Sequence, residues 1–212
     1  MKIHKVAVIG GTGKSGTYLV FKLLQHGFHL KLLLRHPEKH CFKNPLIETI
    51  KGDARDYNSV LGCAEDCQAI ISTLGQPKGE KPIFSQASEN IIKSVQKNGF
   101  SRYIAITGLN VNTPSDQKDE RVRYATQWMY DNFLETTRDK QREYEYLTQN
   151  RMVDWTLVRL PLIIQTDEHF PVQTSLENCK GDKISASDLA DFLIAQLEDR
   201  QYIHKSPFLY NV

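Results

Sequence analysis

The fold of this chain is decided by residues 5–16, which read Lys5-Val6-Ala7-Val8-Ile9-Gly10-Gly11-Thr12-Gly13-Lys14-Ser15-Gly16. A short apolar run rich in β-branched residues ends at Ile9, which predicts a buried strand. Glycines follow at positions 10, 13 and 16. Apolar residues then resume at helical spacing and continue to near Gly27. The stretch therefore predicts a strand, a glycine turn and a helix in direct succession.

That order is typical of a turn that binds the pyrophosphate of a dinucleotide. Glycines allow a tight turn, and their missing Cβ atoms let phosphates approach the N–H groups at the positive end of the helix. The candidate binding residues of the turn are Gly10, Thr12, Gly13, Lys14, Ser15 and Gly16. A nucleoside-triphosphate loop is disfavoured because Val8 occupies the position of its first glycine. A purely structural turn is the remaining alternative.

Strand and helix patterns alternate along most of the chain. Strands are expected at 5–9, 30–34, 47–50, 69–74, 102–107 and 155–159. Helices are expected at 14–27, 57–63, 85–98, 121–149 with a break near Thr136-Thr137, and 188–197 with Ser187 as its cap. A loop is expected at 110–119, and a loop with short strands at 165–183. The alternation predicts an α/β protein with a doubly wound parallel sheet, a single domain over residues 1–212. A small substrate-side region is expected mainly at 108–135 and 160–185.

Composition argues against a nucleic-acid-binding, membrane-spanning or secreted disulfide-rich protein. The 27 Lys and Arg against 25 Asp and Glu leave a net charge of only +2, which argues against nucleic-acid binding. No apolar run is long enough for a membrane span, and the amino-terminal residues lack a signal-peptide core, so we expect a cytoplasmic protein without membrane contact. Four cysteines (Cys41, Cys63, Cys67 and Cys179) are too sparse for a secreted disulfide framework, so we expect them to be reduced.

Arg35 indicates which dinucleotide is bound. Cofactor sites for NAD usually place a carboxylate at the end of the second strand, where it accepts hydrogen bonds from ribose hydroxyls. Here that strand ends in Leu34-Arg35-His36. A guanidinium pairs instead with a 2′-phosphate, and Lys14 and His36 add positive charge nearby. NADP(H) is therefore preferred and NAD(H) is possible, and the alternative is a solvated surface arginine.

Two further strand ends carry candidate cofactor contacts. After the third strand, Asp53 can accept from the adenine amino group and Ala54 offers backbone contact, although Asp53 is alternatively a turn residue. Leu74 and Gly75 close the fourth strand, where small residues admit a ligand near the cofactor ribose.

Together these residues resemble the atypical short-chain dehydrogenase/reductases, and more narrowly the NmrA-like and biliverdin-IXβ/flavin reductase group. The resemblance covers nearly the whole chain. It rests on 6–16, 34–35, 52–53, 74–75, 104–107, 154–159 and 184–197. It implies a Rossmann-type fold that binds NADP(H), with the substrate above the nicotinamide at the carboxyl edge of the sheet. It also implies that Pro161, Leu162 and Ile163 lie near the nicotinamide.

The chain departs from the resemblance where most members carry a Tyr-x-x-x-Lys pair. Those two positions fall on Thr137 and Gln141, and the serine position falls on Thr107, which leaves Thr107 as the one candidate catalytic residue. An alkoxide would lack its acid, so alcohol–ketone chemistry is disfavoured. The flavin and biliverdin reductase branch also lacks the pair, because a conjugated acceptor spreads the negative charge that a hydride brings.

The substrate side carries aromatic residues. Trp128 belongs to an apolar series that is typical of a helix core, or alternatively forms a wall for a planar acceptor, with His169 and Phe170 closing the other side. His36, His40 and Cys41 lack a metalloprotease arrangement, so no metal is expected.

The sequence therefore predicts an NADPH-dependent oxidoreductase that transfers hydride to a conjugated aromatic acceptor (flavin, biliverdin-like or quinone) without a Tyr-Lys proton relay. The alternative is a non-catalytic NmrA-like redox sensor that binds NADP(H) and reports to a protein partner. A sugar-nucleotide epimerase-like enzyme is a third possibility, weakened by the missing Tyr and Lys.

Overall fold

The computed structural model of the protein describes residues 3–40, 42–76 and 79–212. The strands are β1 (Lys5–Ile9), β2 (His29–Leu34), β3 (Ile47–Lys51), β4 (Ala69–Ser72), β5 (Arg102–Gly108), β6 (Asp154–Leu160), β7 (Leu162–Ile164), β8 (Val172–Ser175), β9 (Lys183–Ser185) and β10 (Phe208–Asn211). The helices are α1 (Gly16–Gln25), α2 (Tyr57–Ala64), α3 (Phe84–Asn98), α4 (Glu120–Asn132), α5 (Leu134–Gln149) and α6 (Ala186–Ala195), with a short 3-10 helix η1 (Pro37–Lys39).

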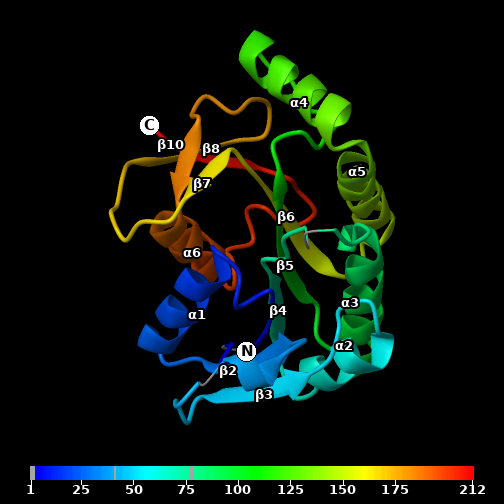
Figure 1. Ribbon diagram of the computed structural model, residues 1–212, viewed down its shortest axis with the longest axis vertical. Coiled ribbons are helices and arrows are strands. Elements are labelled where there is room, and N and C mark those ends of the chain that lie inside the picture. Colours follow the sequence, from blue (N-terminus) through cyan, green and yellow to red (C-terminus); the bar gives the residue numbers. More distant parts are fainter. Residues whose placement is uncertain (1–2, 41, 77–78) are drawn as a thin grey trace.

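One twisted sheet organises the molecule (Figure 1). Its strand order is β3-β2-β1-β4-β5-β6-β10-β8, and a separate pair is formed by β7 and β9. The strands from β3 to β10 pair in parallel, and β8 alone joins the edge antiparallel to β10. The chain order reverses between β1 and β4, so the carboxyl ends of these two strands flank a crevice. The predicted doubly wound α/β fold is confirmed.

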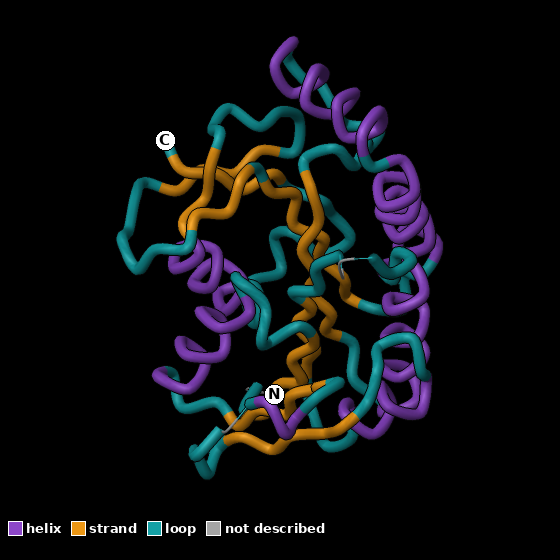
Figure 2. Tube along the Cα trace, in the orientation of Figure 1, coloured by secondary structure: helices purple, strands orange, loops and turns teal. Residues whose placement is uncertain are grey.

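Helices cover both faces of the sheet (Figure 2). Helices α1 and α6 pack together on one face, over a core that includes Val8, Leu32 and Ile104. On the other face α2, α3 and α5 cover a second core, which includes Ile70 and Trp155. Strands buried on both faces need near-continuous apolar sequence, which is why the strand runs are readable from the chain.

Three predicted details are wrong. The strand expected at 69–74 ends at Ser72. The long helix breaks at Phe133, not near Thr136-Thr137, because Phe133 leaves the helical conformation with φ −140°. The Thr137 hydroxyl then donates to Met129 O across the junction at 3.0 Å. The last helix begins at Ala186, because the Ser185 hydroxyl accepts from the amides of Ser187 and Asp188.

Strands β7, β9 and β10 were not expected from the sequence. The buried Arg159 of β6 connects this region to the 110–119 loop: it lies against the Phe208 ring at 3.6 Å and pairs with Asp116 at 2.5 Å. Its guanidinium also donates to Ser206 O and Leu176 O. One buried cation therefore ties the 110–119 loop to the segments that carry Leu176 and Ser206.

The structure also bears on two expectations from composition, the absence of a membrane span and the reduced state of the cysteines. None of the helices in the described residues combines the length and apolar character needed to cross a bilayer. Cys63, Cys67 and Cys179 are buried free thiols, and burial raises the pKa of Cys67 to about 11. Cys41 lies outside the described residues.

Candidate active site

The glycine turn between β1 and α1 requires its glycines. Gly10 has φ +84°, and a Cβ there would lie 2.7 Å from the Thr73 carbonyl carbon. At Gly16, a Cβ would overlap the Gly10 carbonyl oxygen. The Gly13 amide closes the turn by donating to Gly10 O at 3.0 Å. The backbone therefore folds back on itself where side chains would prevent it.

The start of α1 is suited to an anion. The Ser15 side chain forms no cap, and the first turn carries no acidic residue. Among the described residues, the amides of Thr12, Lys14 and Ser15 donate no hydrogen bond. Free amides at the positive end of a helix dipole attract phosphate.

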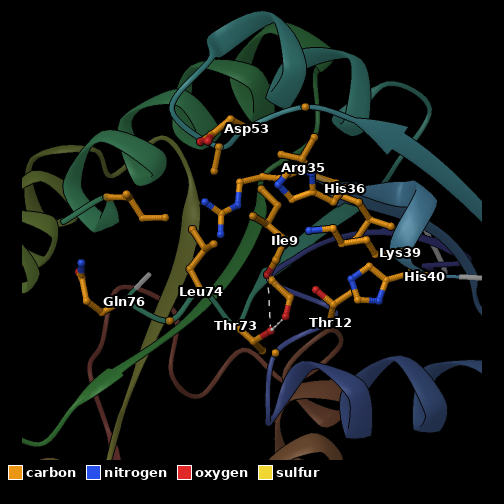
Figure 3. A pocket seen from close by; sticks show the side chains of 18 residues that line it. Ile9, Thr12, Arg35, His36, Lys39, His40, Asp53, Thr73, Leu74 and Gln76 are labelled. Carbon is orange, nitrogen blue, oxygen red and sulfur yellow. Dashed lines mark hydrogen bonds between the residues drawn. The ribbon is translucent and has the colours of Figure 1, made fainter. Parts of the chain in front are cut away.

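A cavity of about 320 Å³ opens beside this turn, at the carboxyl ends of β1, β2 and β4 (Figure 3). Eight of the predicted cofactor residues line it: Gly10, Thr12, Gly13, Arg35, Asp53, Ala54, Leu74 and Gly75. Arg35 points toward the space between Asp53 and Leu74. The cavity therefore combines a glycine turn, free amides and a cation, which fits a phosphorylated dinucleotide.

Arg35 belongs to a chain of ion pairs that the sequence did not suggest. Its guanidinium pairs with Glu80 at 2.7 Å, and Glu80 also pairs with Arg55 at 2.8 Å. Arg55 in turn pairs with Asp53 at 3.2 Å. The hydrogen bond from Arg35 lowers the pKa of the Glu80 carboxyl. A carboxylate therefore accompanies the cation expected to meet the 2′-phosphate.

The other predicted cofactor residues lie outside this cavity. Lys14, Ser15 and Gly16 form the far side of the turn, with Lys14 exposed and Ser15 buried. Pro161, at the end of β6, is buried; Leu162 is exposed on β7, and Ile163 packs against the α1–α6 core. Their assignment to the cofactor stays a prediction.

Lys39, His40 and Gln76 also line the cavity, and none of the three was predicted from the sequence to bind the cofactor. Lys39 belongs to η1, which follows Arg35 directly. The available indication for Lys39 was its place four residues beyond Arg35, the arginine predicted to meet a phosphate. Gln76 donates to the backbone carbonyl of Glu80 at 2.8 Å and so shapes the segment that carries Glu80.

Three polar groups without a hydrogen-bond partner among the described residues lie near the carboxyl end of β5. The Thr107 hydroxyl and the Asn110 amide nitrogen are buried and have no hydrogen-bond partner among the described residues. The Lys140 ammonium lies 4.8 Å from the centre of the Phe84 ring. A Cβ on Gly108 would overlap the Asn110 side-chain oxygen and lie 3.7 Å from Lys140 Nζ. The glycine therefore leaves room for two polar side chains at this strand end.

Thr137 and Gln141 have structural contacts instead of a Tyr-Lys arrangement. Thr137 is buried and donates to α4. The Gln141 amide accepts from Asn112 N at 2.9 Å and donates to Asn112 O at 3.1 Å. Gln141 therefore fastens the 110–119 loop to α5.

Glu143, one turn beyond Lys140, is a buried carboxyl below the β5 edge. Its Oε1 accepts from the Ser88 hydroxyl at 2.6 Å, and the same hydroxyl contacts the Tyr103 hydroxyl at 2.8 Å. Oε2 has no partner among the described residues. Burial raises the pKa of Glu143 to about 7. The group is therefore poised between its two protonation states near neutrality.

We expect Glu143→Gln to flatten the pH dependence of stability. Because the folded pKa is raised to about 7 from 4.5, the folded protein retains a proton that the unfolded chain releases. The stabilisation from this group is complete below about pH 4 and is lost as pH rises through about 7. Denaturant unfolding over this range should show a fall in the wild type that the variant lacks. Glu145→Gln, exposed on the same helix, is the control, and an unchanged slope in Glu143→Gln would contradict the assignment.

The predicted substrate residues do not meet in one pocket of the described residues. Trp128 lies half-exposed on α4, which projects from the body of the molecule, and contacts the Phe133 ring at 5.6 Å (Figure 1). His169 binds Asp188 of α6 at 2.7 Å, and Phe170 donates its amide to the same carboxylate. Their substrate roles stay predictions.

His169, Asp188 and Asp191 place ligand atoms within 4.8 Å of one another. Lys22 Nζ lies 2.5 Å from Asp191 and offsets one of the two carboxylate charges. Asp188 also accepts from Asn211 at 2.8 Å. The cluster therefore pins the 165–171 segment to α6.

Comparisons with known proteins place the chain among dinucleotide-binding proteins. Residues 10–200 match the family model described as NAD(P)H-binding. A bifunctional dihydroflavonol 4-reductase/flavanone 4-reductase from Pyrus communis is 27% identical over 193 residues, covering 76% of this chain and 54% of that protein. The chain spans about half the length of the curated relatives it matches.

Two solved structures illustrate the shared fold. A short-chain dehydrogenase/reductase from Veillonella parvula, in complex with NADP, superposes with a TM-score of 0.81 at 13% identity, covering 99% of this chain and 95% of that one. ChuY from Escherichia coli O157:H7, described as an anaerobillin reductase, gives a TM-score of 0.80 at 19% identity, covering 98% and 97%. The predicted Rossmann-type fold is confirmed.

Proposed function

Because this chain belongs to the NAD(P)H-binding family, we propose that it is an NADPH-dependent oxidoreductase that reduces a conjugated acceptor such as a flavin, a biliverdin-like tetrapyrrole or a quinone. The observation that carries the proposal is the cavity at the carboxyl ends of β1, β2 and β4, where the glycine turn and Arg35 face the same space. The bound nicotinamide supplies the hydride.

The residues of the cavity divide the binding of the cofactor between them. The free amides of the glycine turn bind the pyrophosphate, and Arg35 binds the 2′-phosphate. Asp53 accepts from the adenine amino group while Ala54, whose carbonyl is fixed by Asn90 at 2.9 Å, packs beside the ring. Leu74 and Gly75 then direct the nicotinamide end toward β5. For hydride transfer, the protein contributes the relative position of the nicotinamide and the acceptor.

A conjugated acceptor agrees with the chain's own side chains. The positions predicted for a tyrosine–lysine pair carry Thr137 and Gln141, whose side chains contact the α4 junction and the 110–119 loop. An acceptor that delocalises the incoming negative charge does not need that pair. The reductase names of the pear relative and of ChuY support a reductase, without indicating one class of acceptor.

The test is a spectrophotometric screen of NADPH and NADH against FMN, riboflavin, biliverdin and quinones. We expect NADPH oxidation with at least one conjugated acceptor, and weaker oxidation of NADH. Tight NADPH binding without turnover on every acceptor would overturn the enzymatic proposal.

That outcome would favour the second candidate, a redox sensor that reports cofactor state to a protein partner. One observation supports it: Tyr124, Trp128, Phe133 and Leu134 expose large apolar side chains on and beside the projecting helix α4. Contiguous exposed apolar surface often marks a binding site for another molecule.

We expect Thr107→Val to lower FMN reduction by no more than about threefold, because reduced flavin delocalises its charge and needs no acid from the protein. Steady-state kinetics with saturating NADPH would measure the effect. Thr107→Ser, which keeps the hydroxyl, is the matched control. A loss of turnover by about 100-fold in Thr107→Val alone would show that its hydroxyl relays a proton.

A further inference from the structure

The three unpartnered polar groups at the end of β5 carry an inference beyond the cofactor cavity. Buried polar atoms are almost always hydrogen-bonded, so a buried hydroxyl and a buried amide without partners indicate a missing one. Thr107 and Asn110 are 4% and 2% exposed, respectively. Both belong to the strand end over which the nicotinamide is proposed to lie.

Lys140 reaches the same place from α5. Its ammonium lies against Gly108, and within the described residues it forms no hydrogen bond or ion pair. Its one close contact is the face of the Phe84 ring, and the neighbouring Ile83 lines the cofactor cavity. A half-buried lysine without an acceptor is costly, because its charge has lost water without gaining a partner.

We propose that Lys140 is the proton donor to the acceptor, with the Asn110 amide and the Thr107 hydroxyl orienting the acceptor's heteroatom. The inference rests on the proposed reductase function and names a donor for those acceptors that need a proton as well as a hydride. It places the acceptor beside Gly108, whose missing side chain leaves room for the Asn110 side chain close to Lys140.

For a tetrapyrrole acceptor, the nicotinamide supplies a hydride and Lys140 supplies the proton. The acceptor gains two electrons and one hydrogen as hydride at carbon, which leaves a negative charge on a conjugated nitrogen. One N–H bond of the Lys140 ammonium breaks and a new N–H bond forms on that nitrogen. The neutral amine then takes a proton from water, so the lysine is restored for the next turnover.

The surroundings of Lys140 favour proton release. Burial lowers the pKa of Lys140, and the opposing charge that raises it comes from Glu143. The other carboxylate nearby on α5, Asp139, is bound by the Phe84 amide at 2.8 Å and by Ser85 of α3. On β5, the Tyr103 hydroxyl is bound to Ser88. Neither Asp139 nor Tyr103 therefore pairs with the ammonium.

A comparison of FMN with biliverdin as acceptor separates the requirement for a proton donor from hydride transfer. Reduced FMN leaves as an anion above neutral pH and needs no proton donor, whereas reduction of biliverdin needs one. We expect Lys140→Met to lower kcat for biliverdin by about 100-fold and for FMN by less than about threefold. Lys140→Arg should lose as much biliverdin activity as Lys140→Met, because a guanidinium keeps its charge but does not release a proton. Lys97→Met, exposed on α3, is the control.

A second measurement needs neither cofactor nor acceptor. In the cofactor-free protein carrying isotope-labelled lysine, the Cε resonance of Lys140, identified by its loss in Lys140→Met, should titrate below the usual lysine pKa of about 10.4. Glu143→Gln should lower that titration further, because it removes the charge that raises the pKa.

The outcomes separate the two proposals. Full biliverdin activity in Lys140→Arg would show that charge alone matters and would overturn the proton donor, as would an ordinary lysine titration. A wild type that reduces FMN but not biliverdin or a quinone would overturn the donor and leave the reductase standing. A wild type that reduces no acceptor would overturn both.

Discussion

An Arg35→Glu variant is expected to bind NADPH at least about 100-fold more weakly than the wild type, with NADH binding nearly unchanged. The guanidinium is half-exposed at the rim of the cavity, and a charge-assisted contact with phosphate contributes roughly 2–3 kcal/mol. A carboxylate in its place adds repulsion, and each 1.4 kcal/mol changes the dissociation constant about tenfold. Calorimetry with both cofactors measures the two affinities directly.

Glu80 supplies the companion experiment. Its carboxylate pairs with Arg35 at 2.7 Å, so it competes with the 2′-phosphate for the same guanidinium. Glu80→Gln should therefore tighten NADPH binding by a few-fold, in the direction opposite to Arg35→Glu. Equal weakening of NADPH and NADH by Arg35→Glu would show that Arg35 does not recognise the phosphate.

A Gly16→Ala variant is expected to lose detectable cofactor binding and roughly 3 kcal/mol of unfolding free energy. The added Cβ would overlap the Gly10 carbonyl oxygen and lie 2.8 Å from Gly11 Cα. Both are backbone atoms of the turn, so neither can move aside as a side chain would. The start of α1 must then shift away from the turn, which separates the amides that meet the pyrophosphate.

Gly62→Ala is the matched control for this substitution. Gly62 lies in α2, and a Cβ there meets no atom within 4 Å. Alanine has the higher helix propensity, so this variant should keep cofactor binding and gain up to about 1 kcal/mol of stability. Chemical denaturation measures the unfolding free energy of both variants, and calorimetry measures their affinity for NADPH. Unimpaired NADPH binding by Gly16→Ala would contradict the role given to the turn.

Much of the fold was predictable because local patterns and tertiary structure agree there. Strands β1, β2, β4 and β5 are largely buried on both faces, which forces the apolar runs that mark them. The glycine spacing reflects backbone contacts around Gly10 and Gly16 that only glycine permits. The same agreement placed eight predicted residues around one cavity.

The remaining features depend on contacts between distant segments. Glu80 lies 45 residues from Arg35, in a segment without periodicity. No local sequence pattern therefore predicts that the two side chains pair. Lys140 stands in a mixed-charge helical run that is typical of a solvated face, and only packing turns it toward Gly108. Strands of three or four residues, such as β9 and β10, are too short to show a period.

The interior position of β10 sets an order of events during synthesis. Residues 208–211 pair between β6 and β8. One edge of β6 therefore has no strand to pair with until these residues have been synthesised. Until then Arg159 also lacks its Phe208 partner, and the 110–119 segment that it tethers stays unanchored. The growing chain therefore completes the strands from β1 to β6 before the region around β8 and β10, so a translation product that stops before residue 208 exposes the unpaired edge of β6.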